Sequence, residues 1–208
     1  MNQELLNFKP SEKSLKNCER FIELFREYNS HTNLMSKNDL KVIFEKHIVD
    51  SLSIAQSEEF RKAENILDIG TGGGFPSLPI SIFFEDKKVT AVDSINKKIK
   101  FIEQVKNELN LLNLTPICSR IELLDIKGCF DMVTSRALAP LKEIVEYSAP
   151  FLRKNGYIAA YKSKNAQEEL KEADETILKN KLSFIRTLSY TLECGEKFER
   201  CIIFLKKE

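Results

Sequence analysis

The sequence lacks both a long apolar run and an excess of charge of one sign. No stretch approaches the length that spans a membrane, and the N-terminus has no basic region followed by an apolar core. The 32 Lys and Arg residues nearly balance the 31 Asp and Glu residues, so any surface for nucleic acid must be a local patch. We expect a cytoplasmic protein that does not contact a membrane.

Histidine and cysteine are also scarce. The chain has two histidines, and it offers no convincing triad of nucleophile, base and orienting carboxylate. Its five cysteines are scattered without a close pair of metal-ligand spacing, and their odd number argues against a complete disulfide framework. We expect reduced, mostly buried cysteines and no metal site.

Length and periodicity indicate one globular unit. The 208 residues suffice for one α/β core with a helical extension, but not for two sizeable domains. Apolar side chains recur every three or four residues over 11–29, and a second helical pattern runs from about Asp39, a plausible N-cap, to Leu52. We expect residues 1–60 to form a helical extension packed on a core of residues 61–208, in a monomeric protein.

From residue 66 onward, strand and helix patterns alternate, which predicts a parallel sheet. Strands are predicted up to Asp68 and over 88–92, 115–118, 131–134 and 156–161, the last opened by a turn at Gly156, with helices over 76–84, 96–109, 141–147 and 165–178. Two final strand-like runs, 184–192 and 200–205, leave no room for a crossover helix and must pair as a hairpin. The predicted fold is a mostly parallel seven-stranded sheet with an antiparallel C-terminal hairpin, as in Rossmann-like class I S-adenosylmethionine-dependent methyltransferases.

The most informative segment is Ile66–Pro76, an apolar strand that ends at Asp68 and breaks into glycines at 70, 72 and 74. Alternate glycines let a backbone pass close to a ligand and permit the positive φ of a tight turn. A dinucleotide fingerprint would need glycine at position 75, where the chain has Phe75, and no Gly-Lys-Ser or Gly-Lys-Thr of a P-loop follows. The segment therefore points to S-adenosylmethionine, with Asp68, Gly70 and Gly72 among the cofactor-binding residues.

A second acidic residue, Asp93, ends the next predicted strand, close to the offset of about 20 residues at which a carboxylate binds ribose hydroxyls. The alternative is that Asp93 only caps the helix that begins near Asn96. The glycine turn upstream favours the ribose role.

Five ordered motifs resemble one family, the bacterial 16S rRNA (guanine-N7) methyltransferase G family, also known as glucose-inhibited division protein B. They are Lys46–Leu52, Asp68–Pro76, Val92-Asp93-Ser94 followed by Lys97-Lys98 and Phe101, Ser119–Glu122, and Ser135-Arg136-Ala137. The chain departs from the family at Ser77, where glycine is usual, and at Leu138, where an aromatic residue is common. Neither change removes a polar contact, so they affect packing and not the expected activity.

The resemblance implies methyl transfer from S-adenosylmethionine to N7 of one guanine in a decoding-region loop of 16S rRNA, with the rRNA or the small ribosomal subunit as partner. It implies that Gly70 and Phe75 contact the cofactor, that Asp93 anchors the ribose, that Ile121 and Glu122 border the adenine, and that Arg136 is a cofactor-side contact. Guanine N7 has a lone pair and no proton, so it can attack the methyl group in line without a general base. Alignment of the two reactants can supply about 7–11 kcal/mol of such a barrier.

Three residues have competing interpretations. From composition alone His47 is a hydrogen-bonded structural histidine, and the resemblance moves it toward the rim of the active site. Asp50 is either near the site or a solvated or capping carboxylate. Arg136 either forms a surface ion pair or reaches a cofactor carboxylate, a phosphate or a guanine edge. We expect all three at the rim, and neither His47 nor Asp50 as a proton carrier.

Basic residues near predicted helix starts and strand ends are expected around the cofactor mouth and are candidates for contacts with RNA phosphates: Lys97, Lys98, Lys100, Arg153, Lys154, Lys162 and Lys164. Such charges are usually only a solvated face, so RNA rests on the family resemblance. Two other functions stay open: a methyltransferase of the same fold that acts on a protein or small molecule, and a binding protein that has lost catalysis.

Overall fold

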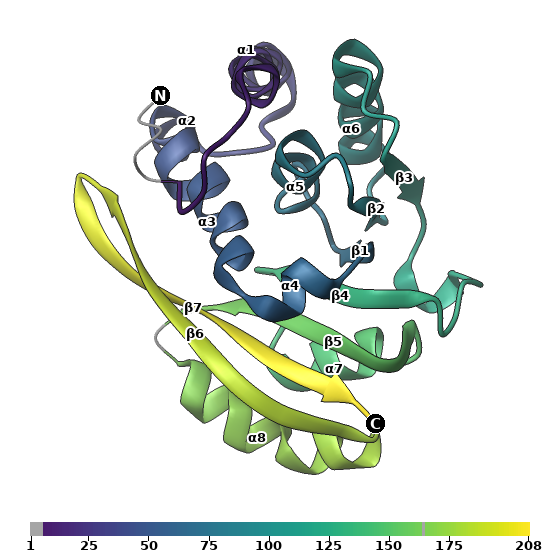
Figure 1. The fold of residues 1–208 in the computed structure, drawn as a ribbon. Coiled ribbons are helices and arrows are strands. Elements are labelled where there is room, and N and C mark those ends of the chain that lie inside the picture. The colour runs from purple at the N-terminus through teal and green to yellow at the C-terminus, as the bar shows by residue number, and fades with distance from the viewer. Residues whose placement is uncertain (1–5, 164) are drawn as a thin grey trace.

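The computed structural model describes residues 6–163 and 165–208. Helices dominate the first third of the chain, strands and helices then alternate, and two long strands end it (Figure 1). The first part contains α1 (Glu12–Thr32), α2 (Lys37–Lys41), η2 (Phe44–Ile48), α3 (Val49–Leu52), η3 (Ser53–Gln56) and α4 (Glu58–Lys62). The rest contains β1 (Asn65–Ile69), α5 (Ser77–Phe83), β2 (Lys88–Asp93), α6 (Asn96–Leu109), β3 (Leu114–Cys118), η4 (Ile121–Leu123), β4 (Phe130–Arg136), α7 (Leu141–Ser148), β5 (Leu152–Lys162), α8 (Ala166–Lys179), β6 (Leu182–Cys194) and β7 (Glu196–Lys207).

The strands form one sheet of seven in the order β3-β2-β1-β4-β5-β7-β6. Strands β1 to β5 run parallel to one another, and β7 runs antiparallel to both β5 and β6. The predicted mostly parallel sheet with an antiparallel C-terminal hairpin is therefore confirmed. Strand order reverses between β1 and β4, which is where open α/β sheets bind ligands.

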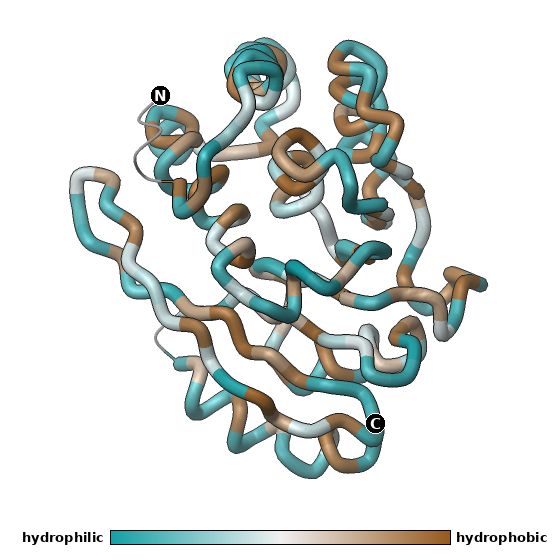
Figure 2. Tube along the Cα trace, in the orientation of Figure 1, coloured by the Kyte–Doolittle hydropathy of each residue, from teal (hydrophilic) through white to brown (hydrophobic). Residues whose placement is uncertain are grey.

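Each face of the sheet carries its own apolar core. Successive strand residues point to opposite faces, so Ile66 joins the core beneath α1, α5 and α6, while Leu67 joins the core beneath α7 and α8 (Figure 1). Figure 2 shows the corresponding hydropathy: α6 and α8 alternate between hydrophobic and hydrophilic segments, and the middle of β7 is hydrophobic. Two-sided burial explains why the central strands are nearly continuous apolar runs.

Aromatic rings fix α1 against the part of the core that carries the glycine turn. Phe25 of α1 lies with its ring centroid 5.6 Å from that of Phe75 and 5.2 Å from that of Phe101 in α6. Phe21, one helical turn earlier, lies 5.7 Å from Phe75. Aromatic pairs at these separations are attractive beyond their buried area, so α1 supports the turn from behind.

The second helical pattern is broken in a way that its periodicity does not reveal. Ser36, not Asp39, is the N-cap of α2, since its hydroxyl accepts a hydrogen bond from the Asp39 amide. The Asp39 carboxylate instead pairs with Lys46, with 2.5 Å between its Oδ1 and the Lys46 Nζ. Residues 44–48 then form a π-helical turn, a feature frequent at functional sites.

Strand β5 is longer than predicted, because Gly156 lies inside it and not in a turn before it. A Cβ on Gly156 would lie 3.0 Å from the carbonyl oxygens of Arg153 and Phe130, beside the irregular pairing of β4 with β5. Arg153 and Lys154 consequently occupy the end of β5 opposite Lys162. The prediction that they lie at the cofactor mouth is wrong.

The cysteines are less buried than the sequence predicts. All five cysteines are free, but only Cys18 and Cys201 are buried, while Cys118 and Cys129 are exposed at strand ends. The expectation of mostly buried cysteines is therefore wrong.

In residues 6–163 and 165–208, no helix combines the length and apolar character needed to cross a membrane.

Candidate functional site

A cleft of about 650 Å³ opens at the reversal point of the sheet. Its walls come from the segments that follow β1, β2, β3 and β4, including Gly70, Asp93, Ile121 and Arg136. The carboxyl ends of parallel strands share one edge, so residues far apart in sequence converge here.

The glycine turn after β1 forms the floor of the cleft. Gly70, Gly72 and Gly74 have φ of +67°, +59° and +89°, values that side chains disfavour. A Cβ on Gly70 would lie 2.5 Å from a Leu138 methyl, and one on Gly74 would lie 2.3 Å from a Leu78 methyl. At Gly72 the nearest atom would be 3.9 Å away, so its missing side chain leaves space beside the cleft.

Asp68 lies under this turn and does not line the cleft. It is fully buried, accepts hydrogen bonds from the Thr134 hydroxyl at 3.1 Å and the Ser77 amide at 3.3 Å, and has a pKa raised to about 6 by burial. Ser77, a departure from the family pattern, also bonds Thr71 through its hydroxyl. Both residues therefore fix the shape of the turn.

Asp93 ends β2 at the side of the cleft with 6% of its surface exposed. Its Oδ2 accepts the Gly72 amide at 3.0 Å and Lys98 Nζ at 3.2 Å, and its Oδ1 accepts the Ile95 amide at 2.9 Å. Asp93 is not the N-cap of α6, which is Ile95, although it binds the amide of that residue. A carboxylate oxygen accepts more than one hydrogen bond, so this group retains capacity for hydroxyl donors.

Ile121 and Glu122 lie in η4, immediately after β3, and both line the cleft. Ile121 is half-buried and Glu122 is exposed. Together with Ile95, which is 42% exposed at the start of α6, Ile121 provides an apolar wall opposite the glycine turn. Such a wall suits a flat aromatic ring.

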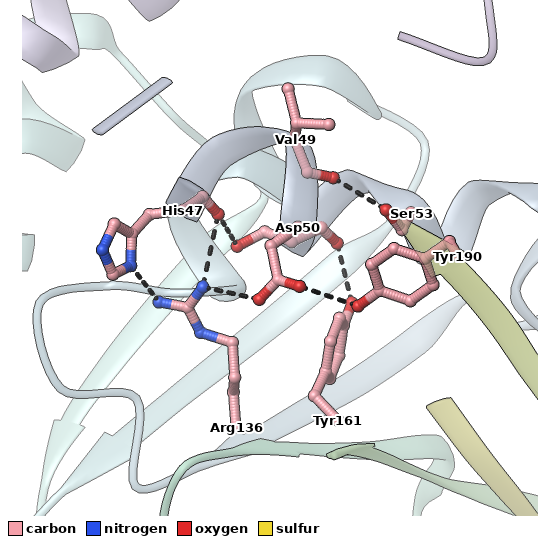
Figure 3. Close-up of polar contacts among 8 residues, drawn as sticks. His47, Val49, Asp50, Ser53, Arg136, Tyr161 and Tyr190 are labelled. Atoms are coloured by element: carbon pink, nitrogen blue, oxygen red, sulfur yellow. Dashed lines mark hydrogen bonds and ion pairs between the residues drawn. The ribbon is translucent and has the colours of Figure 1, made fainter. Parts of the chain in front are cut away.

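Arg136, the last residue of β4, contacts two residues of the helical segment before the sheet (Figure 3). Its Nη1 lies 2.9 Å from Asp50 Oδ2, and its Nη2 lies 2.9 Å from His47 Nδ1. The guanidinium carbon also lies 5.0 Å from the centroid of the Phe75 ring. The three predicted rim residues and Phe75 are thus brought together, and the ion pair of Arg136 is buried and not on the surface.

Burial, together with the charge on Arg136, decides the protonation state of His47. Burial and the guanidinium lower the pKa of His47 to about 3, so its ring is neutral at physiological pH. Because an arginine can only donate, His47 Nδ1 must accept and its Nε2 must carry the proton. His47 is therefore a fixed, neutral acceptor for Arg136.

A second hollow of about 460 Å³ adjoins the cleft and shares Arg136, Ala137 and Leu138 with it. Its wall includes the loop after β4, in which Ala137 has φ +54°. Lys162 holds this loop by donating to the Ala139 carbonyl at 2.8 Å, and its Nζ pairs with Glu169 at 2.5 Å. Arg136 stands between the two spaces.

Sequence reasoning missed Tyr190 as part of this arrangement. Its hydroxyl donates to Asp50 Oδ1 at 2.8 Å, although the two residues are 140 positions apart (Figure 3). No local sequence pattern predicts such a pair, because only the order of the strands in the sheet brings β6 next to Asp50.

Lys164 lies outside the described residues, and within them no group of three or more His, Cys, Asp or Glu side chains could hold a metal ion.

Comparison with known proteins shows similarity to one family over most of the chain. The family model described as rRNA small subunit methyltransferase G matches residues 14–194. A protein of Lactococcus lactis subsp. lactis named ribosomal RNA small subunit methyltransferase G is 38% identical over 203 residues, which are 95% of this chain and 85% of that protein. A protein of the same name from Clostridium perfringens is 38% identical over 161 residues, 76% of this chain and 67% of that protein.

Solved structures show the fold alone, at low sequence identity. A precorrin-6y C5,15-methyltransferase from Geobacter metallireducens has a TM-score of 0.57 and 19% identity, with 77% of this chain and 87% of that chain covered. TYW2 of M. jannaschii, solved in complex with AdoMet, has a TM-score of 0.57 and 16% identity, with 75% and 77% covered. The sheet and its helices are those of methyltransferases.

Proposed function

Because the chain belongs to the rRNA small subunit methyltransferase G family, we propose that it transfers a methyl group from S-adenosylmethionine to N7 of one guanine in a decoding-region loop of 16S rRNA. The observation that carries the proposal is the convergence of the glycine turn, Asp93 and Arg136 on one cleft at the reversal point of the sheet. The substrate is the rRNA or the small ribosomal subunit, which places the protein in the cytoplasm. We also propose a monomer in which residues 61–208 form the transferase core and residues 1–60 pack on it.

The residues of the cleft fit S-adenosylmethionine, which supplies an electrophilic methyl group. Asp93 would accept the ribose hydroxyls, and Ile121 with Glu122 would border the adenine. Gly70, Gly72 and Phe75 would contact the amino-acid part, where the absent side chain of Gly72 leaves room. Asp68, which is buried, would act indirectly by holding the turn.

The Nε atom of Arg136 is available to donate a hydrogen bond to a ligand. Its Nη1 and Nη2 bind Asp50 and His47, while its Nε makes no hydrogen bond within the described part of the chain. Since Arg136 lines both the cleft and the second hollow, this nitrogen can bind the cofactor carboxylate or guanine O6. Guanine N7 carries no proton, so a neutral His47 is compatible with transfer and no general base is needed.

The test is methyl transfer from labelled S-adenosylmethionine to bacterial small subunits that lack the modification, with naked 16S rRNA in parallel. N7-specific strand cleavage would map the target. Asp93→Ala should abolish labelling, whereas Asp174→Ala, an exposed carboxylate on α8, should leave it unchanged. Cofactor binding without label on any RNA would instead favour a protein or small-molecule substrate, or a binding protein without catalysis.

A further inference from the structure

A third hollow of about 560 Å³ extends the second one across the outer strands. It lies between the first turn of α8 and strands β6 and β7, and it shares Ser163 and Arg200 with the second hollow. Figure 1 shows the β6–β7 hairpin continuing past the start of α8, so this part of the sheet is not covered by the helix. The cleft, the second hollow and the third hollow therefore adjoin one another in series.

Strand register places the key residues of this series on a diagonal across the outer strands, in three successive rows. Arg136 pairs with Tyr161 of β5, Lys162 pairs with Cys201 of β7, and Arg200 pairs with Tyr190 of β6. From β4 to β6 there are three inter-strand steps, which span about 14 Å at about 4.8 Å each. The diagonal thus leads from the cofactor cleft to the edge of the sheet.

Hydroxyl groups of β6 line the third hollow. Thr187, Ser189 and Thr191 occupy alternate positions of β6, so their side chains share one face, and all three line this hollow. Arg200, which pairs with Tyr190, lies on the opposite face of the hairpin. Ser163 and Gln167 face them from the segment that begins α8. Hydroxyl and amide side chains are among the usual donors to the phosphates and sugars of nucleic acids.

Arg200 lies at the junction of the second and third hollows. It is half-buried, its Nε exposes less than 1 Å² and has no hydrogen-bond partner, and no carboxylate of the described residues lies within 4 Å of its guanidinium nitrogens. By contrast, the partly buried guanidinium of Arg186 binds the Glu59 carboxylate through two nitrogens. An unpaired, partly desolvated positive charge is costly, and a bound anion would remove that cost.

We propose that the second and third hollows form a channel for the single-stranded RNA next to the target nucleotide, that the RNA crosses from one face of the sheet to the other beyond the end of β5, and that Arg200 binds a backbone phosphate at the junction. The phosphate supplies the charge that Arg200 lacks, and the hydroxyls of β6 contact the following nucleotide. The proposal rests on the proposed function, since it assigns a path to the RNA substrate. It explains how a chain with almost balanced charge holds RNA: through one local, unpaired guanidinium.

The experiment compares wild type, Arg200→Ala and Arg200→Gln for binding of naked 16S rRNA by filter retention at several salt concentrations. The neutral variants should weaken RNA binding about tenfold. The slope of log affinity against log salt should become shallower by about 0.7, the value for one phosphate contact on single-stranded RNA. The affinity for S-adenosylmethionine should stay at the wild-type value.

Arg26→Ala, which removes an exposed arginine of α1, is the matched control and should leave the salt slope unchanged. If Arg200→Ala does not fold, Arg200→Gln decides, because it retains most of the side-chain stem and a donor. A wild-type salt slope in the folded neutral variant overturns the channel. A wild type that methylates no RNA at all overturns the proposed function instead, so the two failures are distinguishable.

Discussion

The Tyr190 hydroxyl donates a 2.8 Å hydrogen bond to one oxygen of the Asp50 carboxylate, whose other oxygen is held by Arg136 at 2.9 Å. Strand β6 and the helical segment before the sheet therefore act on the same carboxylate (Figure 3). Asp50 and Arg136 expose only 3% and 15% of their side chains, so the pair is largely shielded from water. Asp50, held in turn by Tyr190, therefore fixes the orientation of the Arg136 side chain at the cleft.

Asp50→Asn should be strongly destabilising. It leaves a buried guanidinium without its counter-ion, and the loss of one partner of such a pair costs about 3–5 kcal/mol of unfolding free energy. Methyl transfer should fall more than tenfold, because Arg136 loses its orientation. Urea denaturation and labelling of 16S rRNA measure the two effects, and a variant as stable and active as wild type would show that Asp50 does not position Arg136.

Tyr190→Phe should have a smaller effect, about 1 kcal/mol, because it removes one hydrogen bond and leaves the ion pair intact. Tyr157→Phe is the matched control, since no hydrogen bond of its hydroxyl occurs within the described part of the chain. Urea denaturation of both variants measures how much the Tyr190–Asp50 hydrogen bond contributes to the free energy of unfolding. Equal losses would mean that the bond to Asp50 contributes nothing to stability.

The variants Gly74→Ala and Gly128→Ala separate two contributions to the loss of stability: backbone strain at positive φ and steric overlap of the new Cβ with a neighbour. Both glycines have positive φ, +89° and +66°, and an alanine there costs about 1–2 kcal/mol. At Gly128 a Cβ would meet no atom within 4 Å, but at Gly74 it would lie 2.3 Å from a Leu78 methyl. Gly74→Ala should lose a further 1–3 kcal/mol or so from overpacking. Chemical denaturation of both variants checks the difference, and cofactor titration should show weaker binding for Gly74→Ala only.

His47 should give the protein a pH-dependent stability below neutrality. Its pKa is lowered from 6.5 to about 3 in the folded chain, so between these values the unfolded chain binds more protons than the folded chain. The contribution of His47 is complete above pH 6.5 and is lost as the pH falls from 6.5 toward 3. Asp68, whose pKa is raised to about 6, acts in the opposite direction over part of this range. The variant His47→Asn isolates the histidine, because the amide oxygen can still accept from Arg136.

The difference in unfolding free energy between wild type and His47→Asn should therefore increase with pH from about 3 to 6.5 and be flat above that. Urea denaturation at each pH measures it. A difference that does not change with pH would mean that His47 titrates normally. The same neutral ring predicts that the rate of methyl transfer in wild type shows no inflection near pH 6.5, and a histidine-dependent inflection there would contradict this assignment.

Lys162→Met should loosen the loop of residues 137–140, which follows Arg136 between the cleft and the second hollow. The lysine side chain is 8% exposed and holds the Ala139 carbonyl, while Glu169, its partner, also accepts the Leu141 amide at 2.7 Å. Removal of the ammonium leaves Glu169 without its counter-ion, so both thermal stability and methyl transfer should fall. Lys154→Met, an exposed lysine at the other end of the same strand, should change neither. Protease sensitivity between residues 137 and 140 would report the loosened loop directly.

Much of the fold could be predicted from local patterns. Burial on both faces makes the strand from Ile66 to Ile69 a continuous apolar run, and the short connection near Gly195 forces β6 and β7 into a hairpin. Errors occurred where a contact made in the folded chain overrides the signal of a single residue. Asp39 resembles a helix cap but pairs with Lys46, and Gly156 resembles a turn glycine but allows close approach to Phe130.

The sequence by itself determined the glycine turn, the strand that ends at Asp93 and the placement of both at one edge of a parallel sheet. These features depend on backbone conformation and strand periodicity, which are encoded within a few residues. Only the tertiary structure decided that Arg136 pairs with Asp50, that His47 is neutral, that Tyr190 completes the group and that Arg200 has no carboxylate partner among residues 6–163 and 165–208. The reason is physical: the charge and hydrogen bonding of a side chain depend on burial and on neighbours from distant segments, and no local spacing records them.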